Sequence, residues 1–188
     1  MGLPEPYQSQ FEAKTQEFEG RTNYLYADSR GNPTCGIGHM VPSGDAAIAL
    51  PFSGGNPAED WHAVKIATVG RVAAFYAHLT TSRLPDDAIN VLFAQDCDAA
   101  FSQIRSFLPS FDALPPTVQC AIADMSFNLG SGKLHADYFG PHSKFGPAIA
   151  RGDWQTAAAE CIRKGIPAAR NAYTQALIMS AASGGAIS

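Results

Sequence analysis

Two carboxylic acids and one hydroxyl group in the segment 19–39 are suited to the hydrolysis of a sugar linkage. They belong to Glu19, Asp28 and Thr34, which lie close together in the chain. Glycoside hydrolysis uses one carboxyl group as an acid on the leaving oxygen and a second on the opposite side of the sugar. A hydroxyl beside the second carboxylate can orient the attacking water. Taken alone, Thr34 fits equally well a β-branched residue in an ordinary strand.

A short helix is expected to carry Glu19. Tyr7, Phe11 and Phe18 recur at helical spacing, and Gly20 is typical of the position just beyond a helix end. Glu19 then lies in the last turn, where the negative end of the helix dipole disfavours a second negative charge. That position suits Glu19 to the role of a proton donor.

A β-hairpin is expected to carry the other two groups. The turn-rich run 28–33 lies between the strand-like runs 24–26 and 34–37. The hairpin should bring Asp28 and Thr34 together near its base. Because Asp28 lies on a solvated turn, it is suited to remain ionised, and two carboxyl groups in different environments can serve as acid and base.

The spacing of this stretch resembles the catalytic signature of the phage-type lysozymes, the family 24 glycoside hydrolases. Matching positions are Glu19-Gly20, Tyr26, Asp28, Gly31, Thr34 and the run Gly36-Ile37-Gly38-His39, with no gap between them. The segments 92–100 and 120–130 resemble the T-even phage lysozymes in particular. The resemblance covers about residues 10 to 180, apart from an apparent insertion after His39.

The resemblance implies one α+β, mostly helical domain with a lysozyme-like two-lobed fold. A smaller lobe with the hairpin would span about residues 20–85, and a helical lobe about 1–19 plus 109–188. The apolar pattern predicts a connecting helix over 86–108, a buried helix over 117–129 ended by Gly130, and two further helices over 154–163 and 168–182. The run 40–57, broken by Pro and Gly, is expected to be an ordered loop.

The activity implied is N-acetylmuramidase cleavage of peptidoglycan at the β-1,4 bond between N-acetylmuramic acid and N-acetylglucosamine. Glu19 would protonate the leaving oxygen, while Asp28 and Thr34 would hold a water, which favours inversion. The resemblance also implies substrate-binding positions and a His39 to Asp96 ion pair. The substrate-binding positions are Gly38, His39, Phe127, Asn128 and Arg170.

The chain departs from the family pattern at three places. Asn128 stands where a family member carries Gln, and Ala169 stands where an arginine precedes the one that pairs with the catalytic glutamate, here Arg170. The third departure is the insertion, in which Phe52 and Trp61 could stack on a sugar or simply decorate a surface loop. Phe127 fits core packing as well as sugar contact.

Composition excludes several other classes of function. The chain has 188 residues, 46% of them hydrophobic, and a net charge of −4, with the excess of basic residues confined to the C-terminal third. No basic run with interleaved aromatics favours nucleic acid, and the five dispersed histidines favour no metal site; no cofactor is expected. The scattered cysteines are expected to be reduced core residues: Cys35, Cys97, Cys120 and Cys161.

The sequence leaves the biological setting open. No signal peptide or apolar run long enough to cross a membrane is recognised, so synthesis in the cytoplasm is expected, with action on peptidoglycan in the periplasm or outside the cell after export or release. One setting is a phage endolysin, and another is a secreted antibacterial effector with a cognate immunity protein. A monomer is expected in both. A non-catalytic wall-binding protein is the third alternative, which the intact Glu19, Asp28 and Thr34 disfavour.

Overall fold

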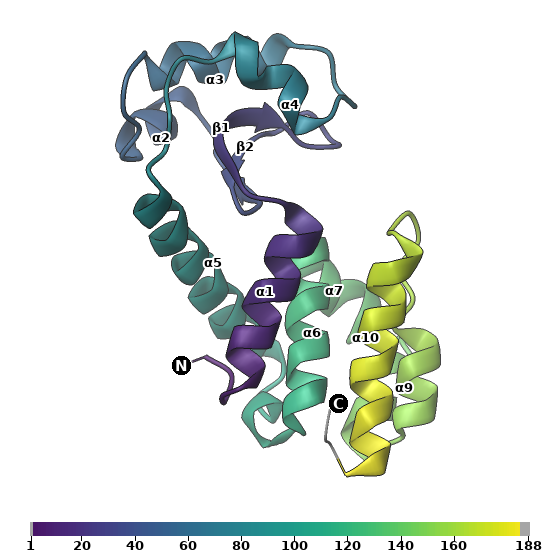
Figure 1. The fold of residues 1–188 in the computed structure, drawn as a ribbon. Coiled ribbons are helices and arrows are strands. Elements are labelled where there is room, and N and C mark those ends of the chain that lie inside the picture. Colours follow the sequence, from purple (N-terminus) through teal and green to yellow (C-terminus); the bar gives the residue numbers. More distant parts are fainter. Residues whose placement is uncertain (1, 185–188) are drawn as a thin grey trace. The chain divides into compact units, whose positions relative to one another are not determined.

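The computed structural model describes residues 2–184, and the chain divides into two compact units. We call Glu19–Asp96 the hairpin unit, and Met1–Phe18 together with Cys97–Ser188 the helical unit. The structure is mostly helical with one small antiparallel sheet, so the predicted α+β, mostly α-helical class is confirmed (Figure 1). Among the described residues, none of the helices is both long enough and apolar enough to span a bilayer.

The sheet of the hairpin unit has three strands in the order β1-β2-β3. Their bounds are Thr22–Ala27 for β1, Pro33–Gly36 for β2 and His39–Met40 for β3. β1 and β2 form the predicted hairpin, in which Tyr26 pairs with Thr34 and Ala27 with Pro33. Its buried side is apolar, with Leu25, Ala27, Cys35 and Ile37 at most 3% exposed. Burial of this side determines which side chains of the hairpin face outward.

The region after His39 is more helical than expected. Besides α3 (Pro57–Ile66) and α4 (Ala73–Tyr76), it contains α2 (Gly44–Ala49) within the run that was predicted to be a loop. That prediction was wrong because Ser43 is an N-cap, whose Oγ accepts a hydrogen bond from the Ala46 backbone N–H at 3.1 Å. Asn56 and Pro57 likewise start α3. The Ser, Gly, Asn and Pro residues that were read as breaks in the chain therefore lie at the starts of helices.

The helical unit is built around one buried helix. α6 (Pro116–Leu129) is buried from Thr117 to Ser126 and ends at Gly130, as predicted. α5 (Asp86–Phe107) confirms the long helix predicted over 86–108 to within one residue of its end. Phe101, on α5, lies 5.8 Å ring to ring from Phe11 and 6.3 Å from Phe111. Aromatic packing of this kind fixes helix positions because large rings fill the core with few free rotamers.

Four helices, not two, follow α6 in the described chain. α9 (Trp154–Glu160) and α10 (Ala168–Ser180) were predicted, whereas α7 (Ser131–Tyr138) and α8 (Phe145–Arg151) were missed. α7 begins immediately after Gly130, a residue that predicts only an end of a helix. α8 has seven residues, with Gly146 and Pro147 in its first turn. Such a short helix is stabilised by packing, because Phe145, Ala148 and Ile149 are buried, and not by its own propensity.

The four cysteines are buried, as predicted, and none forms a disulfide. Burial raises the pKa of Cys35 to about 12, of Cys120 to about 12 and of Cys161 to about 11. Since only the thiolate reacts, these thiols are both inaccessible and protonated near neutral pH.

We expect the native thiols to resist modification. At about pH 8 the folded protein should react with dithionitrobenzoate over hours, whereas in guanidinium chloride all four cysteines should react within minutes. Absorbance of the released thionitrobenzoate measures both rates. Fast release of one equivalent from the native protein would contradict the burial of one of the cysteines.

Candidate functional site

Glu19 is the last residue of α1 (Tyr7–Glu19), as predicted, and Gly20 follows with a positive φ of 77°. Its half-buried carboxyl group lies against the Gly36–His39 turn of the same unit. A methyl group added at Gly38 would lie 3.6 Å from both Cγ and Oε2 of Glu19. Gly38 also has a φ of +74°, which strains any larger residue. On this side the Glu19 side chain therefore contacts the backbone of Gly38, which has no side chain.

Asp28 is held by the turn that it begins. Its Oδ1 accepts the backbone N–H groups of Arg30 and Asn32, both at 2.8 Å, and its Oδ2 accepts Asn32 Nδ2 at 3.1 Å. Asp side chains commonly stabilise turns in this way. Three donors on one carboxylate fix its orientation with little freedom to rotate.

Thr34 is 4% exposed and its hydroxyl donates to the Asn32 carbonyl at 3.0 Å. Because the proton is directed to that carbonyl, the lone pairs of Oγ1 are left to accept hydrogen bonds. Asp28 and Thr34 lie at the turn end of the hairpin, since Asp28 follows the last pair, Ala27 and Pro33. The hairpin therefore brings the two residues to one place, as expected, but at its turn end and not at its base.

Asn32 joins these two groups and was not predicted as a site residue. Its backbone N–H and side-chain amide donate to Asp28, while its carbonyl accepts from Thr34. The signal was available, since Asp-Ser-Arg-Gly-Asn-Pro has the composition of an Asp-stabilised turn.

Tyr26 is a second residue that was not assigned to the site. Burial raises the pKa of its phenol to about 12, and the nearby acidic groups of Glu19, Cys35 and Asp28 raise it further. The phenol group therefore lies in the electrostatic field of both carboxyl groups and keeps its proton at physiological pH. Tyr26 also pairs with Thr34 across the hairpin, so it is positioned by the same register.

The predicted contact between His39 and Asp96 is present. His39 Nδ1 lies 2.9 Å from Oδ2 and 3.1 Å from Oδ1 of Asp96. The pair ties strand β3 to helix α5 within the hairpin unit. It thereby fixes one end of the Gly36–His39 turn that lies against Glu19.

The region after His39 supports the hairpin from another direction. Lys65 Nζ donates to the Gly31 carbonyl at 3.2 Å, and Val69 packs on Gly31. Trp61, one of the two aromatics considered for sugar stacking, donates its indole N–H to the Val41 carbonyl at 2.7 Å. Phe52, the other, is partly exposed. Trp61 thus serves to attach α3 to the chain after β3.

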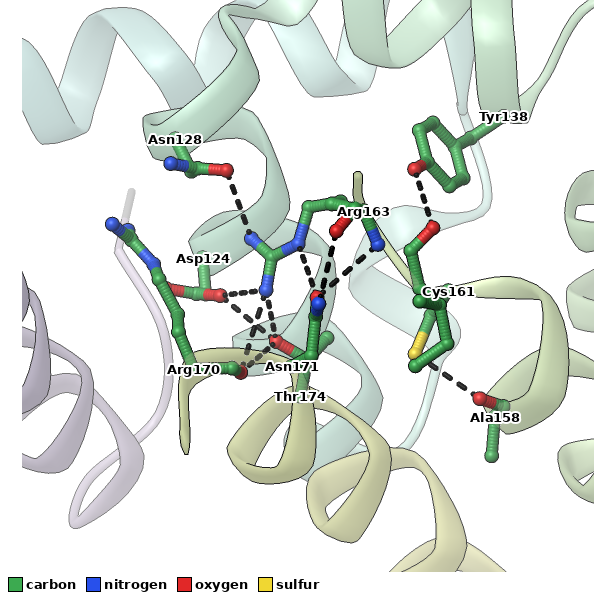
Figure 2. A network of polar contacts seen from close by, with 10 residues as sticks. Asp124, Asn128, Tyr138, Ala158, Cys161, Arg163, Arg170, Asn171 and Thr174 are labelled. Carbon is green, nitrogen blue, oxygen red and sulfur yellow. Dashed lines mark hydrogen bonds and ion pairs between the residues drawn. The ribbon is translucent and has the colours of Figure 1, made fainter. Parts of the chain in front are cut away.

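The other predicted site residues lie in the helical unit, around a buried charge cluster. Asp124 binds two arginines, Arg170 through Nε at 2.8 Å and Arg163 through Nη2 at 2.9 Å (Figure 2). Asn128 Oδ1 accepts from Arg163 Nη1 at 3.4 Å. Arg163 is 2% exposed and was not predicted, because an arginine between two predicted helices is ordinarily solvated.

Phe127 is half-buried and packs edge to face on Phe11, with ring centroids 6.2 Å apart. That contact supports the core-packing alternative without excluding contact with a ligand. The pairing of Arg170 with Glu19 stays a prediction, as do the substrate contacts of Gly38, His39 and Asn128.

No protein-family model matches the chain, and a search of curated proteins finds no match.

We expect Asp124→Asn to destabilise the helical unit by about 3–5 kcal/mol, because it leaves two buried guanidinium groups without a counter-charge. Asp137→Asn is the matched control, since Asp137 pairs with Lys133 on the surface and its loss should cost under about 0.5 kcal/mol. Urea denaturation followed by circular dichroism measures both. A loss below about 1 kcal/mol for Asp124→Asn would show that the cluster does not stabilise the fold.

Proposed function

We propose that this protein is a peptidoglycan hydrolase, an N-acetylmuramidase that cleaves the β-1,4 bond between N-acetylmuramic acid and N-acetylglucosamine. The arrangement of the Asp28–Thr34 turn supports the proposal most. There a single residue, Asn32, orients a carboxylate and a hydroxyl that stand six positions apart in the chain. The resemblance to phage-type lysozymes gives these two groups, with Glu19, a common role.

In the proposed mechanism Glu19 donates its proton to the glycosidic oxygen as the bond to the anomeric carbon breaks. A water on the opposite face gives one proton to Asp28 and a hydrogen bond to Thr34 Oγ1. Thr34 can accept that bond because its own proton is directed to the Asn32 carbonyl. The water then keeps a lone pair for the anomeric carbon, and the product has inverted configuration.

Two further features support these roles. Tyr26 supplies a phenol that keeps its proton, because burial and then the Glu19 and Asp28 carboxyl groups raise its pKa. Gly38 lies beside the Glu19 carboxyl group, and its φ of +74° would strain any larger residue there. The proposed fold is accordingly lysozyme-like, with a hairpin lobe, a helical lobe and a connecting helix.

We propose action on peptidoglycan in the periplasm or outside the cell, after release or export, by a monomer without a cofactor. A phage endolysin and an antibacterial effector would share this chemistry. An immunity protein would be a partner of the effector alone.

Glu19→Gln should abolish cleavage while leaving the fold intact, because the amide is isosteric and cannot donate the proton. Mass spectrometry of material released from purified peptidoglycan should find reducing N-acetylmuramic acid ends with the wild type only. The matched control is Glu17→Gln, an exposed position on the same helix, which should retain full activity.

Either of two results would oppose the proposal. Activity retained by Glu19→Gln would remove the assigned acid, and anhydro ends would indicate a transglycosylase. Polarimetry of fresh products separates the stereochemical alternatives. An α-anomer formed first indicates inversion, whereas a β-anomer would make Asp28 a nucleophile.

Asn32→Ala should lower kcat by about tenfold to a hundredfold and change KM little, because it removes one donor from Asp28 and loosens the turn. Ser29→Ala, in the same turn and exposed, is the control and should stay within about twofold of the wild type. Initial rates on solubilised peptidoglycan strands give both constants. Equal kcat values for the two variants would show that the Asn32 amide does not position Asp28.

A further inference from the structure

A segment of the hairpin unit exposes large apolar side chains next to one another. From the last residue of α3 into α4, Ile66 is 86% exposed, Val69 48%, Val72 76% and Phe75 36%. Nine large hydrophobic side chains are exposed over residues 2–184, and four of them fall within these ten positions. Exposed apolar residues are normal when they occur singly, whereas a cluster marks a surface that meets another apolar phase.

Buried residues anchor the backbone of the 66–75 segment. Tyr76 is fully buried, and its hydroxyl donates to the Thr68 carbonyl at 2.7 Å. Val64 is also fully buried, two residues before the exposed Ile66. The segment turns at Gly70, which has a φ of +82°. Because its base is anchored, the exposure of the apolar side chains is built into the fold.

The charged residues within this segment and next to it in the chain are basic. From 61 to 85 the chain carries Lys65, Arg71 and Arg83 and no Asp or Glu, although the whole protein has a net charge of −4. Arg71 is exposed, and its guanidinium lies 5.5 Å from the centre of the Phe75 ring. Exposed apolar groups flanked by cations are what an anionic bilayer attracts, since the acyl region takes the apolar groups and the phosphates take the cations.

We propose that the 66–75 segment docks the protein on a bilayer that contains anionic phospholipid, with Ile66 and Val72 entering the interface and Arg71 contacting phosphate. A soluble polyanion would use the cations but leave four apolar side chains in water. Val69 contacts Gly31, in the turn that holds Asp28, so docking would take place beside the candidate site. Binding to lipid is independent of whether the proposed hydrolase function is correct.

Flotation with vesicles tests the proposal on the full-length protein. The wild type should bind vesicles of phosphatidylcholine mixed with phosphatidylglycerol and should not bind vesicles of phosphatidylcholine alone. The double variant Ile66→Ser/Val72→Ser should lose at least tenfold in binding. Arg71→Gln should lose about fivefold, the effect of one cation near an anionic surface. Raised salt should weaken the wild type in the same direction.

Two matched variants serve as controls. Val91→Ser changes an apolar side chain that is 56% exposed on α5, outside the segment, and should bind like the wild type. Glu19→Gln should also bind like the wild type, so a failed hydrolase assignment and a failed lipid assignment give different results. Circular dichroism should show all variants folded, since each altered lipid-facing side chain is exposed.

Absence of wild-type binding to anionic vesicles would overturn the proposal and leave the segment to a protein partner. Equal binding by the wild type and the Ile66→Ser/Val72→Ser variant would overturn it as well. Binding that survives high salt and the Arg71→Gln change undiminished would contradict the role given to the phosphate groups.

Discussion

The candidate site depends on one turn in which a carboxylate accepts the N–H groups of the chain that follows it. Asp28 accepts from Arg30 and twice from Asn32, and the same Asn32 accepts from Thr34. A hairpin loop without these bonds could adopt many conformations, because each unfixed residue adds backbone freedom. Here the groups proposed to hold the water are also the groups that close the turn. The turn itself therefore sets their geometry.

The rest of the hairpin unit stabilises that turn and the turn beside Glu19. His39 and Asp96 tie β3 to α5, while Lys65 and Val69 contact the Gly31 end of the hairpin. Asp60 adds a buried anchor, since its carboxylate accepts the backbone N–H groups of Thr81 and Ser82 at 3.0 and 2.7 Å. The region after His39 is thus part of the framework of the site. Within this region the 66–75 segment exposes apolar side chains, which are the ones proposed to contact a bilayer.

The helical unit contains buried charged side chains. Asp124 is 1% exposed and bridges Arg163 and Arg170, each at most 3% exposed. Thr174 and Asn171 supply further polar contacts to the guanidinium of Arg163, which meets the requirement that buried charges be hydrogen-bonded (Figure 2). One carboxylate between two cations fixes α10 and the chain before it against α6. Specific polar contacts of this kind have few alternative arrangements in an apolar core.

The sequence by itself determined the elements whose signals are local. The helix ending at Glu19, the hairpin, the α5 and α6 helices and the burial of the cysteines follow from periodicity, turn residues and composition, which act between neighbours in the chain. Only the tertiary structure decided the features that depend on residues far apart. α8 formed because its apolar residues are buried, and Arg163 became a core residue because Asp124 faces it. Asn32 belongs to the local cases although it was not predicted, because its bonds to Asp28 and Thr34 reach only four and two residues along the chain. Local signals are read from one stretch of chain, whereas burial and long-range pairing exist only after the chain has folded.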